Sequence, residues 1–144
     1  MNLRDRFETK RMALAVVRTE GSARIEQTFV ERVLPGDMWR HFVVIPEASK
    51  EWWDLLVSGV RELWGSHSLV HSGLPPVHRL CGWLVEQDRR EEAAALMTHV
   101  AAHPVPLPRA TDPGTGAVRL DVPDGLVDLS TVAPEALALH PHES

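Results

Sequence analysis

The apolar pattern of the first thirty-five residues fits two structures. Leu3, Phe7 and Leu14 recur at helical spacing, but the unbroken apolar run at residues 12–17 also has the length of a strand. Past a Gly-Ser break, the apolar positions of residues 25–34 trace one helical face, which favours a helix there. A β-hairpin that pairs the two segments stays open as the alternative.

The next apolar segment predicts a buried strand. The run Phe42-Val43-Val44-Ile45 is short, rich in β-branched residues and closed by Pro46, as strands often are. Pro46 and the two residues after it are typical of a helix N-terminus.

The helix expected over residues 47–64 has an unusually wide apolar surface. At 100° per residue its polar side chains fall within an arc of about 100°, and the rest of its circumference is apolar. A surface helix normally shows a narrower apolar stripe. We therefore expect this helix either to be central in the domain or to be half core and half interface.

The second half of the chain predicts helices followed by a small sheet. Two helices, from Pro76 to about residue 87 and over residues 89–102, form an αα-hairpin. Val118 to Val122 alternates apolar and polar positions, and the Pro-Asp-Gly turn signal that follows predicts a β-hairpin with residues 126–129. One short helix near Thr131 is expected after it.

These elements predict a helix-rich α+β single domain. A small antiparallel sheet packs against three or more helices, with the tryptophan-rich helix at the centre. We divide the chain into a main core (1–103), a proline-rich linker (104–116), a C-terminal β-hairpin and short helix on the same domain (117–139), and a frayed tail (140–144).

Composition narrows the function classes. A chain of 144 residues is long enough to bury a core without disulfides, and its single cysteine cannot form an internal one. The net charge of −5 and the scattered arginines argue against nucleic-acid binding. We expect no membrane association, because no apolar run reaches bilayer length and the charged N-terminus lacks the pattern of a signal peptide. A bacterial cytoplasmic protein is the expectation.

The tryptophans suggest an interaction surface. Tryptophan is enriched at binding hot spots because it buries a large area and keeps one donor. We expect an interface with another protein, or with a second copy in a homo-oligomer, on the over-wide apolar helix. The candidate interface residues are Trp52, Trp53, Leu56, Val60 and Trp64.

The resulting hypothesis is a small acidic cytosolic module that is non-catalytic and needs no cofactor. An immunity-like or antitoxin-like role and a regulatory accessory subunit both fit it. Sequence motifs for catalysis are missing: there is no P-loop or nucleophile elbow, and Cys81 with His78 three residues away is thin support for a thiolate nucleophile.

Histidine spacing gives the alternative hypothesis, a metal-dependent enzyme or metal-binding protein. His67 and His71 are four residues apart, as are His99 and His103, and residues four apart share one helical face. Together the two pairs offer four ligands for zinc or iron. Against this, no acidic residue lies within either pair, and Pro104 disfavours helix at the preceding histidine.

Overall fold

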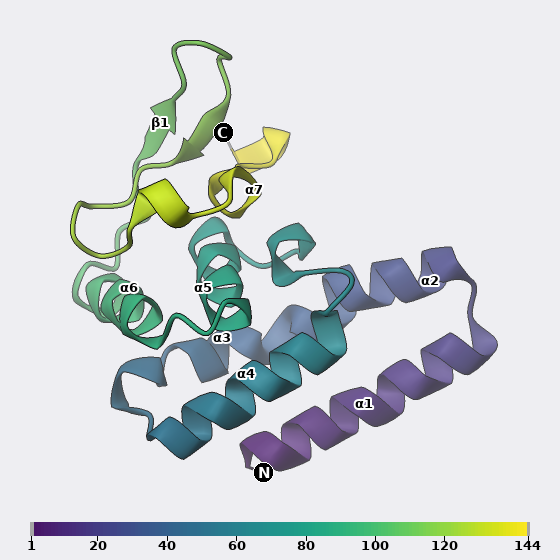
Figure 1. The fold of residues 1–144 in the computed structure, drawn as a ribbon. Helices are drawn as coiled ribbons and strands as arrows, with labels where there is room; N and C mark the ends of the chain where they lie inside the picture. The colour runs from purple at the N-terminus through teal and green to yellow at the C-terminus, as the bar shows by residue number, and fades with distance from the viewer. Residues whose placement is uncertain (1, 144) are drawn as a thin grey trace.

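The N-terminal segment forms two helices that lie side by side and run in opposite directions (Figure 1). The computed structural model, which describes residues 2–143, places α1 at Leu3–Glu20 and α2 at Ala23–Thr28. The side chains of Asn2 and Ser22 cap the two helices by accepting backbone hydrogen bonds. The β-hairpin alternative is therefore excluded, because the apolar run that suggested it lies inside α1.

The strand predicted at residues 42–45 is wrong. Met38, Phe42 and Ile45 are buried at helical spacing, whereas Val43 and Val44 are exposed. The apolar run thus combined part of one helical face with two valines on the surface. The backbone here continues from α2 through a succession of helical segments: a π-helix η1 (Phe29–Val33), a 3₁₀ turn η2 (Leu34–Asp37), α3 (Met38–Phe42) and a second 3₁₀ turn η3 (Ile45–Glu47).

The tryptophan-rich helix α4 (Lys50–Trp64) lies centrally, as predicted, between α1 and α5. It begins at Ser49, whose side chain accepts a hydrogen bond from the backbone of the first turn. Gly59 lets α1 approach closely, since a Cβ atom at this position would lie 2.7 Å from ring atoms of Phe7.

The predicted αα-hairpin is confirmed as α5 (Pro76–Glu86) and α6 (Arg90–Ala102). A short 3₁₀ turn, η4 (Leu69–His71), leads from α4 toward it and packs on α5. Asp88 takes a positive φ of 56° in the turn between the two helices, and its carboxylate accepts a 2.6 Å hydrogen bond from the indole of Trp53.

The sheet has two short antiparallel strands, β1 (Arg109–Thr111) and β2 (Val118–Leu120). The second strand lies where it was predicted, but its predicted partner is wrong: β1 comes from the segment expected to be a linker. The connecting turn explains this. Gly116 has a φ of 71° and its amide donates to the carbonyl of Asp112, which closes the hairpin on the N-terminal side of β2. Residues 126–129 form no strand and lead into the 3₁₀ turn η5 (Leu129–Thr131).

The C-terminal residues are anchored, contrary to the fraying predicted for the tail. After α7 (Pro134–Leu137), a 3₁₀ turn η6 (Pro141–Glu143) brings the carboxylate of Glu143 to within 2.6 Å of the buried guanidinium of Arg79. This ion pair connects the segment expected to be a tail with α5.

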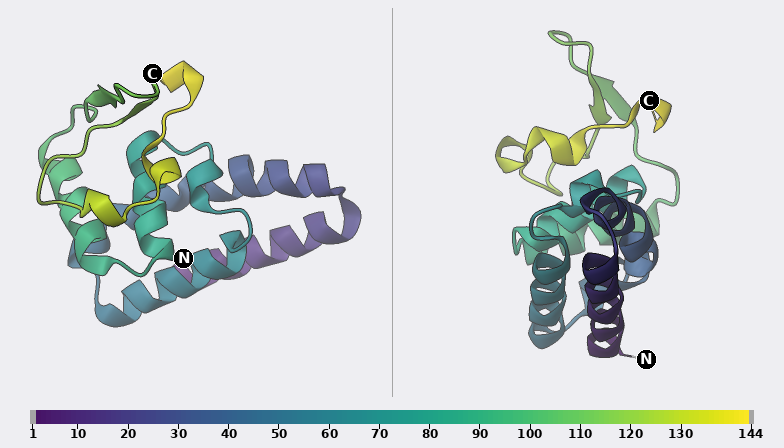
Figure 2. Two further views of the ribbon diagram at one scale, coloured as in Figure 1. Left: turned by 45° about the horizontal axis from the view of Figure 1, so that its top comes forward. Right: turned by 90° about the vertical axis from the view of Figure 1, so that its right-hand side faces the viewer.

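The complete arrangement is a helix-rich α+β fold with one small antiparallel sheet. Figures 1 and 2 show the hairpin and the C-terminal segment over α5 and α6, on the side away from α1 and α4. Buried side chains from α1 through to α7 belong to one hydrophobic cluster. None of the helices in the described part of the chain has the length and hydropathy needed to cross a bilayer.

Candidate functional site

Most of the predicted interface residues on α4 are core residues. Trp53, Leu56, Val60 and Trp64 are each at most 2% exposed. The indole of Trp53 donates to Asp88, and that of Trp64 donates over 2.9 Å to a backbone carbonyl in η1. The wide apolar arc of the helix is therefore covered within this chain, by neighbours on several sides.

Trp52 is the member of this set that reaches the surface. It is half-buried and lines a depression of about 560 Å³ between α1, α3 and α4. The fold turns the other four side chains that were expected at an interface into the core of this chain.

The predicted metal-binding histidines do not converge. His67 follows the end of α4 and lies 3.8 Å from Glu26, while His71 borders a polar depression with His140 and His142. His99 and His103 stack on each other at the end of α6, with 4.2 Å between ring centroids. Within residues 2–143, no three His, Cys, Asp or Glu side chains lie close enough to hold a metal ion. In this structure the two histidine pairs lie on different elements and are not brought together as one set of four ligands.

Cys81 and His78 lie on α5 without forming a nucleophile and base. The thiol of Cys81 is fully buried, and burial raises its pKa far above the usual range, so that it stays protonated. His78 faces Phe42, with 6.4 Å between the ring centroids. Burial lowers the pKa of this histidine.

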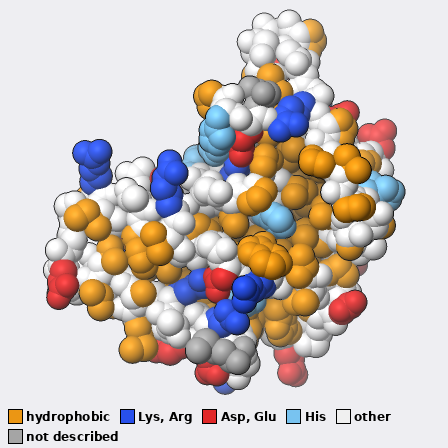
Figure 3. Space-filling view, turned by 180° about the vertical axis from the view of Figure 1, so that it is seen from behind, with side chains coloured by type: hydrophobic (Ala, Val, Ile, Leu, Met, Phe, Trp, Pro, Cys, Tyr) orange, Lys and Arg blue, Asp and Glu red, His pale blue; other side chains and the backbone are white. Residues whose placement is uncertain are grey.

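An exposed apolar face, which sequence reasoning missed, extends over the N-terminal helices. Figure 3 shows hydrophobic side chains over these helices and across the centre of the molecule seen from behind. Trp39 remains 45% exposed and lies under the guanidinium of Arg40, 5.5 Å from the ring centroid. Seven large hydrophobic side chains of the N-terminal elements are exposed, and this set is called the N-terminal apolar face below: Met12, Val16, Ile25, Val33, Trp39, Val43 and Val44.

The depression beside this face is lined by positive charge and apolar surface. Arg4, Arg6 and Arg40 line it, together with His41 and apolar side chains that include Trp52, and none of the described lining residues is acidic. We call it the arginine depression. Figure 3 shows Lys and Arg side chains gathered next to the apolar centre of this face.

Asp37 partly balances the positive charge next to the arginine depression. Its carboxylate accepts hydrogen bonds from Lys10 and, over 3.3 Å, from Arg6. Although burial opposes the effect, the hydrogen bond and charge of Lys10 lower the pKa of Asp37, which keeps it ionised. Arg4 and Arg40 are exposed at the rim.

His41 is the buried polar group of this region. It is 8% exposed and stacks near Phe7, with 6.2 Å between ring centroids. Burial lowers the pKa of the imidazole, against the charge of Asp37, so it is neutral at neutral pH. Within the described residues its Nε2 has no hydrogen-bond partner, a property it shares with Nδ1 of His78.

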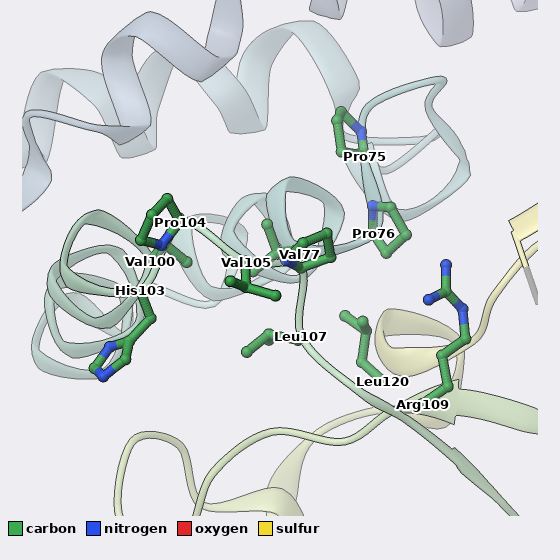
Figure 4. Close-up of a pocket in the computed structure, with 11 residues that line it drawn as sticks. Pro75, Pro76, Val77, Val100, His103, Pro104, Val105, Leu107, Arg109 and Leu120 are labelled. Atoms are coloured by element: carbon green, nitrogen blue, oxygen red, sulfur yellow. The ribbon is translucent and has the colours of Figure 1, made fainter.

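A second, apolar groove lies between the start of α5, the end of α6 and the sheet. Its volume is about 230 Å³, and Figure 4 shows Pro75, Val77 and Leu107 from these segments around it, with Arg109 at the edge. Its lining is mostly proline and aliphatic side chains, with His103 and Arg109 as the polar members.

Comparison of the chain with protein-family models, with curated proteins and with solved structures gives no match.

Proposed function

We propose that this chain is a non-catalytic protein-interaction module, and that it binds its partner through the N-terminal apolar face. One observation carries the proposal. Of the eight large hydrophobic side chains that are exposed in the described residues, seven lie between positions 12 and 44, and the remaining one is Val105. Scattered exposed apolar residues are normal in a soluble protein, but a concentration of them marks an interaction site.

The composition of this face matches that of binding hot spots. Tryptophan and arginine are the residues most enriched there, and α3 presents Trp39 and Arg40 stacked together at the surface. Val43 lies one helical turn beyond Trp39 and is 48% exposed, which extends the same stripe. The face therefore supplies an aromatic anchor with apolar surroundings.

The candidate nucleophile supports a binding role over a catalytic one. Cys81 is buried and protonated, so it offers no reactive thiolate. Within the proposed class, an immunity-like or antitoxin-like protein and a regulatory accessory subunit both use such a face. Where the partner is a second copy of this chain, the same face forms a homo-oligomer.

The test compares two matched valine substitutions. Val43→Asp places a charge on the N-terminal apolar face, and Val105→Asp places the same charge on an exposed valine elsewhere. Each variant of the 144-residue chain, and the wild type, is expressed in the native host, and co-purifying proteins are quantified with isotope labels. Oligomeric state is read by native mass spectrometry.

We expect a defined partner, or the homo-oligomer, to be retained by Val105→Asp and reduced at least tenfold by Val43→Asp. Equal recovery with both variants, or a wild type that is monomeric and isolated without a defined partner, contradicts the proposal. Circular dichroism spectra of the two variants control for misfolding.

A further inference from the structure

We propose that the arginine depression binds an acidic, apolar segment of the partner protein, with Asp or Glu next to a large hydrophobic side chain. This inference builds on the interaction role proposed above and specifies the chemistry of the partner. It assigns the carboxylate to the guanidinium groups of Arg4 and Arg40 and the hydrophobic side chain to the surface of Trp52.

The charge of the lining selects an anion. Three arginines line the depression and none of its described lining residues is acidic, although the chain as a whole carries a net charge of −5. Arg6 is engaged by Asp37, which leaves Arg4 and Arg40 at the exposed rim as the groups placed for a new carboxylate. Guanidinium and carboxylate form strong, often bidentate hydrogen bonds, so this arrangement favours a carboxylate over a neutral group.

The apolar part of the lining favours an anion that is attached to a hydrophobic group. Leu3, Trp52, Leu55 and Val44 line the same depression, and Val44 is 41% exposed. A free inorganic anion would leave these side chains uncovered, whereas an anion attached to an aromatic or aliphatic group covers them. The volume of about 560 Å³ lies within the range of clefts that enclose organic groups, roughly 300–1,000 Å³.

Continuity with the N-terminal apolar face indicates a polypeptide as the occupant. Val44 lines the depression and directly follows Val43, which belongs with Trp39 to the exposed stripe of α3. An occupant that covers both the stripe and the depression is larger than a small molecule. A segment of a partner chain meets both requirements, because its side chains reach the two places at once.

His41 gives an independent reason to expect a ligand here. Buried polar atoms in folded proteins are nearly always hydrogen-bonded, so an unpaired one requires an explanation. His41 is one of the residues that line the arginine depression, and it is only 8% exposed. Its Nε2 is buried and has no hydrogen-bond partner in the described residues. Because Nε2 is itself covered, the imidazole must turn toward the depression for a carboxylate or carbonyl oxygen of a bound segment to accept its hydrogen bond.

The experiment selects ligands without assuming their sequence. A phage library of random twelve-residue peptides is selected against the immobilised full-length protein, and enriched peptides are synthesised. Their affinities are measured by isothermal titration calorimetry for the wild type, for the double variant Arg4→Gln/Arg40→Gln and for Arg24→Gln. Arg24 is exposed on α2 and does not line the depression, so its substitution controls for the change in charge.

We expect the enriched peptides to carry Asp or Glu within two positions of Phe, Trp, Leu or Ile. The double variant should weaken their binding at least tenfold and Arg24→Gln by no more than about twofold. Binding should also weaken as salt rises, because the ion pairs are partly exposed. In ¹⁵N spectra of the wild type, the indole of Trp52 and the imidazole of His41 should shift on binding, while the imidazole of His78 stays in place.

Three outcomes overturn the inference: no enrichment, enriched peptides that lack acidic residues, or affinities that the double variant leaves unchanged. Apolar, uncharged peptides whose binding is lost with Val43→Asp but kept by the arginine variant would refute this inference alone. The interaction role itself is decided separately, by the comparison of Val43→Asp with Val105→Asp.

Discussion

Arg79 is a buried arginine whose charge is paired with one carboxylate, that of Glu143. Its side chain is 2% exposed, and its two terminal nitrogens donate to the two oxygens of Glu143 over 2.9 and 2.6 Å. The same nitrogens also donate to the carbonyls of Leu74 and Ala138. Removing one partner of a buried pair leaves the other charge uncompensated, which costs more than the pair itself contributes.

Glu143→Gln should therefore lower the free energy of unfolding by about 2 kcal/mol at pH 7, a value reduced for the partial exposure of the carboxylate. Urea denaturation followed by circular dichroism measures it. Glu135→Gln, an exposed position in α7, is the matched control and should change stability by less than about 0.5 kcal/mol. A cost equal to that of the control would show that the ion pair does not stabilise the fold.

The ion pair between Arg79 and Glu143 predicts that folding stability depends on pH. Hydrogen bonds from Arg79 lower the pKa of Glu143 to about 2, from an ordinary value of 4.5. A carboxyl with a lowered pKa in the folded state contributes stability above its unfolded pKa and loses it as the pH falls through the folded value. The difference between wild type and Glu143→Gln should thus be complete above about pH 5 and shrink toward pH 2. Denaturation curves at several pH values test it, and a difference that is constant over this range would contradict the pKa assignment.

Gly59 allows a close contact between α1 and α4. A methyl group at this position would lie 2.7 Å from the ring of Phe7, which is 1% exposed and has little room to move. Overpacking costs typically about 1–3 kcal/mol, which exceeds the roughly 1 kcal/mol that alanine gains over glycine in a helix. Gly59→Ala should therefore destabilise the protein by about 1–2 kcal/mol in thermal or urea denaturation.

Gly36→Ala is the control for this substitution, because a Cβ atom there meets nothing within 4 Å. Combining Gly59→Ala with Phe7→Leu should restore part of the loss caused by the first change, since the smaller side chain removes the contact. Strictly additive losses in the double variant would mean that the ring does not oppose the methyl group.

At the scale of elements, the turn between α5 and α6 is tied to the central helix α4 through Asp88. This residue has a positive φ, which asparagine and glycine tolerate, and its carboxylate is the partner of the buried Trp53 indole. Asp88→Asn keeps an acceptor oxygen and the backbone preference, so it should be nearly neutral. Asp88→Gly keeps only the backbone and should cost about 1 kcal/mol, and Asp88→Ala loses both and should cost about 2–3 kcal/mol. Urea denaturation of the three variants gives the ranking, and a glycine variant as stable as the wild type would mean that the indole hydrogen bond contributes little.

Helices with clear periodicity were predictable from the sequence, but one short run was not. The αα-hairpin and the central helix were predicted within a few residues of their positions in the structure, because the spacing of their apolar residues marks them locally. The run Phe42 to Ile45 gave a wrong strand prediction because two of its four apolar residues are on the surface. Local sequence does not encode that exposure. β2 pairs with β1 because the glycine-containing turn before β2 closes a hairpin. The Pro-Asp-Gly turn signal after β2 closes none.

The candidate site was harder to predict than the fold for a related reason. The width of the apolar arc on α4 correctly indicated a central helix, yet which of its side chains stay exposed depends on how α1 and α5 cover it. The arginine depression brings Arg4 next to Arg40 from positions far apart in the chain, and no motif connects them. Exposure and convergence of this kind are tertiary properties, and one sequence taken alone carries little information about them.

At the scale of the whole molecule, the C-terminal segment shares its hydrophobic core with the helices. Leu120, Val122 and Leu137 are at most 7% exposed and belong to the same cluster as the buried residues of α1 and α4. Buried contacts that are shared in this way couple the unfolding of the two parts. We therefore expect one calorimetric transition with an enthalpy of about 100 kcal/mol for 144 residues, and equal calorimetric and van't Hoff enthalpies.

Glu143→Gln tests this coupling, because it weakens only the attachment of the C-terminal segment to α5. In a single cooperative unit, a loss of about 2 kcal/mol lowers the midpoint of the whole transition by about 4–8 °C, and the helical signal at 222 nm falls at the same temperature as the heat peak. If residues 104–143 instead unfolded separately, the substitution would shift a small early transition and leave the main helical one unchanged. The helices would then be stable without the C-terminal layer, and the shared cluster would not couple the two parts energetically.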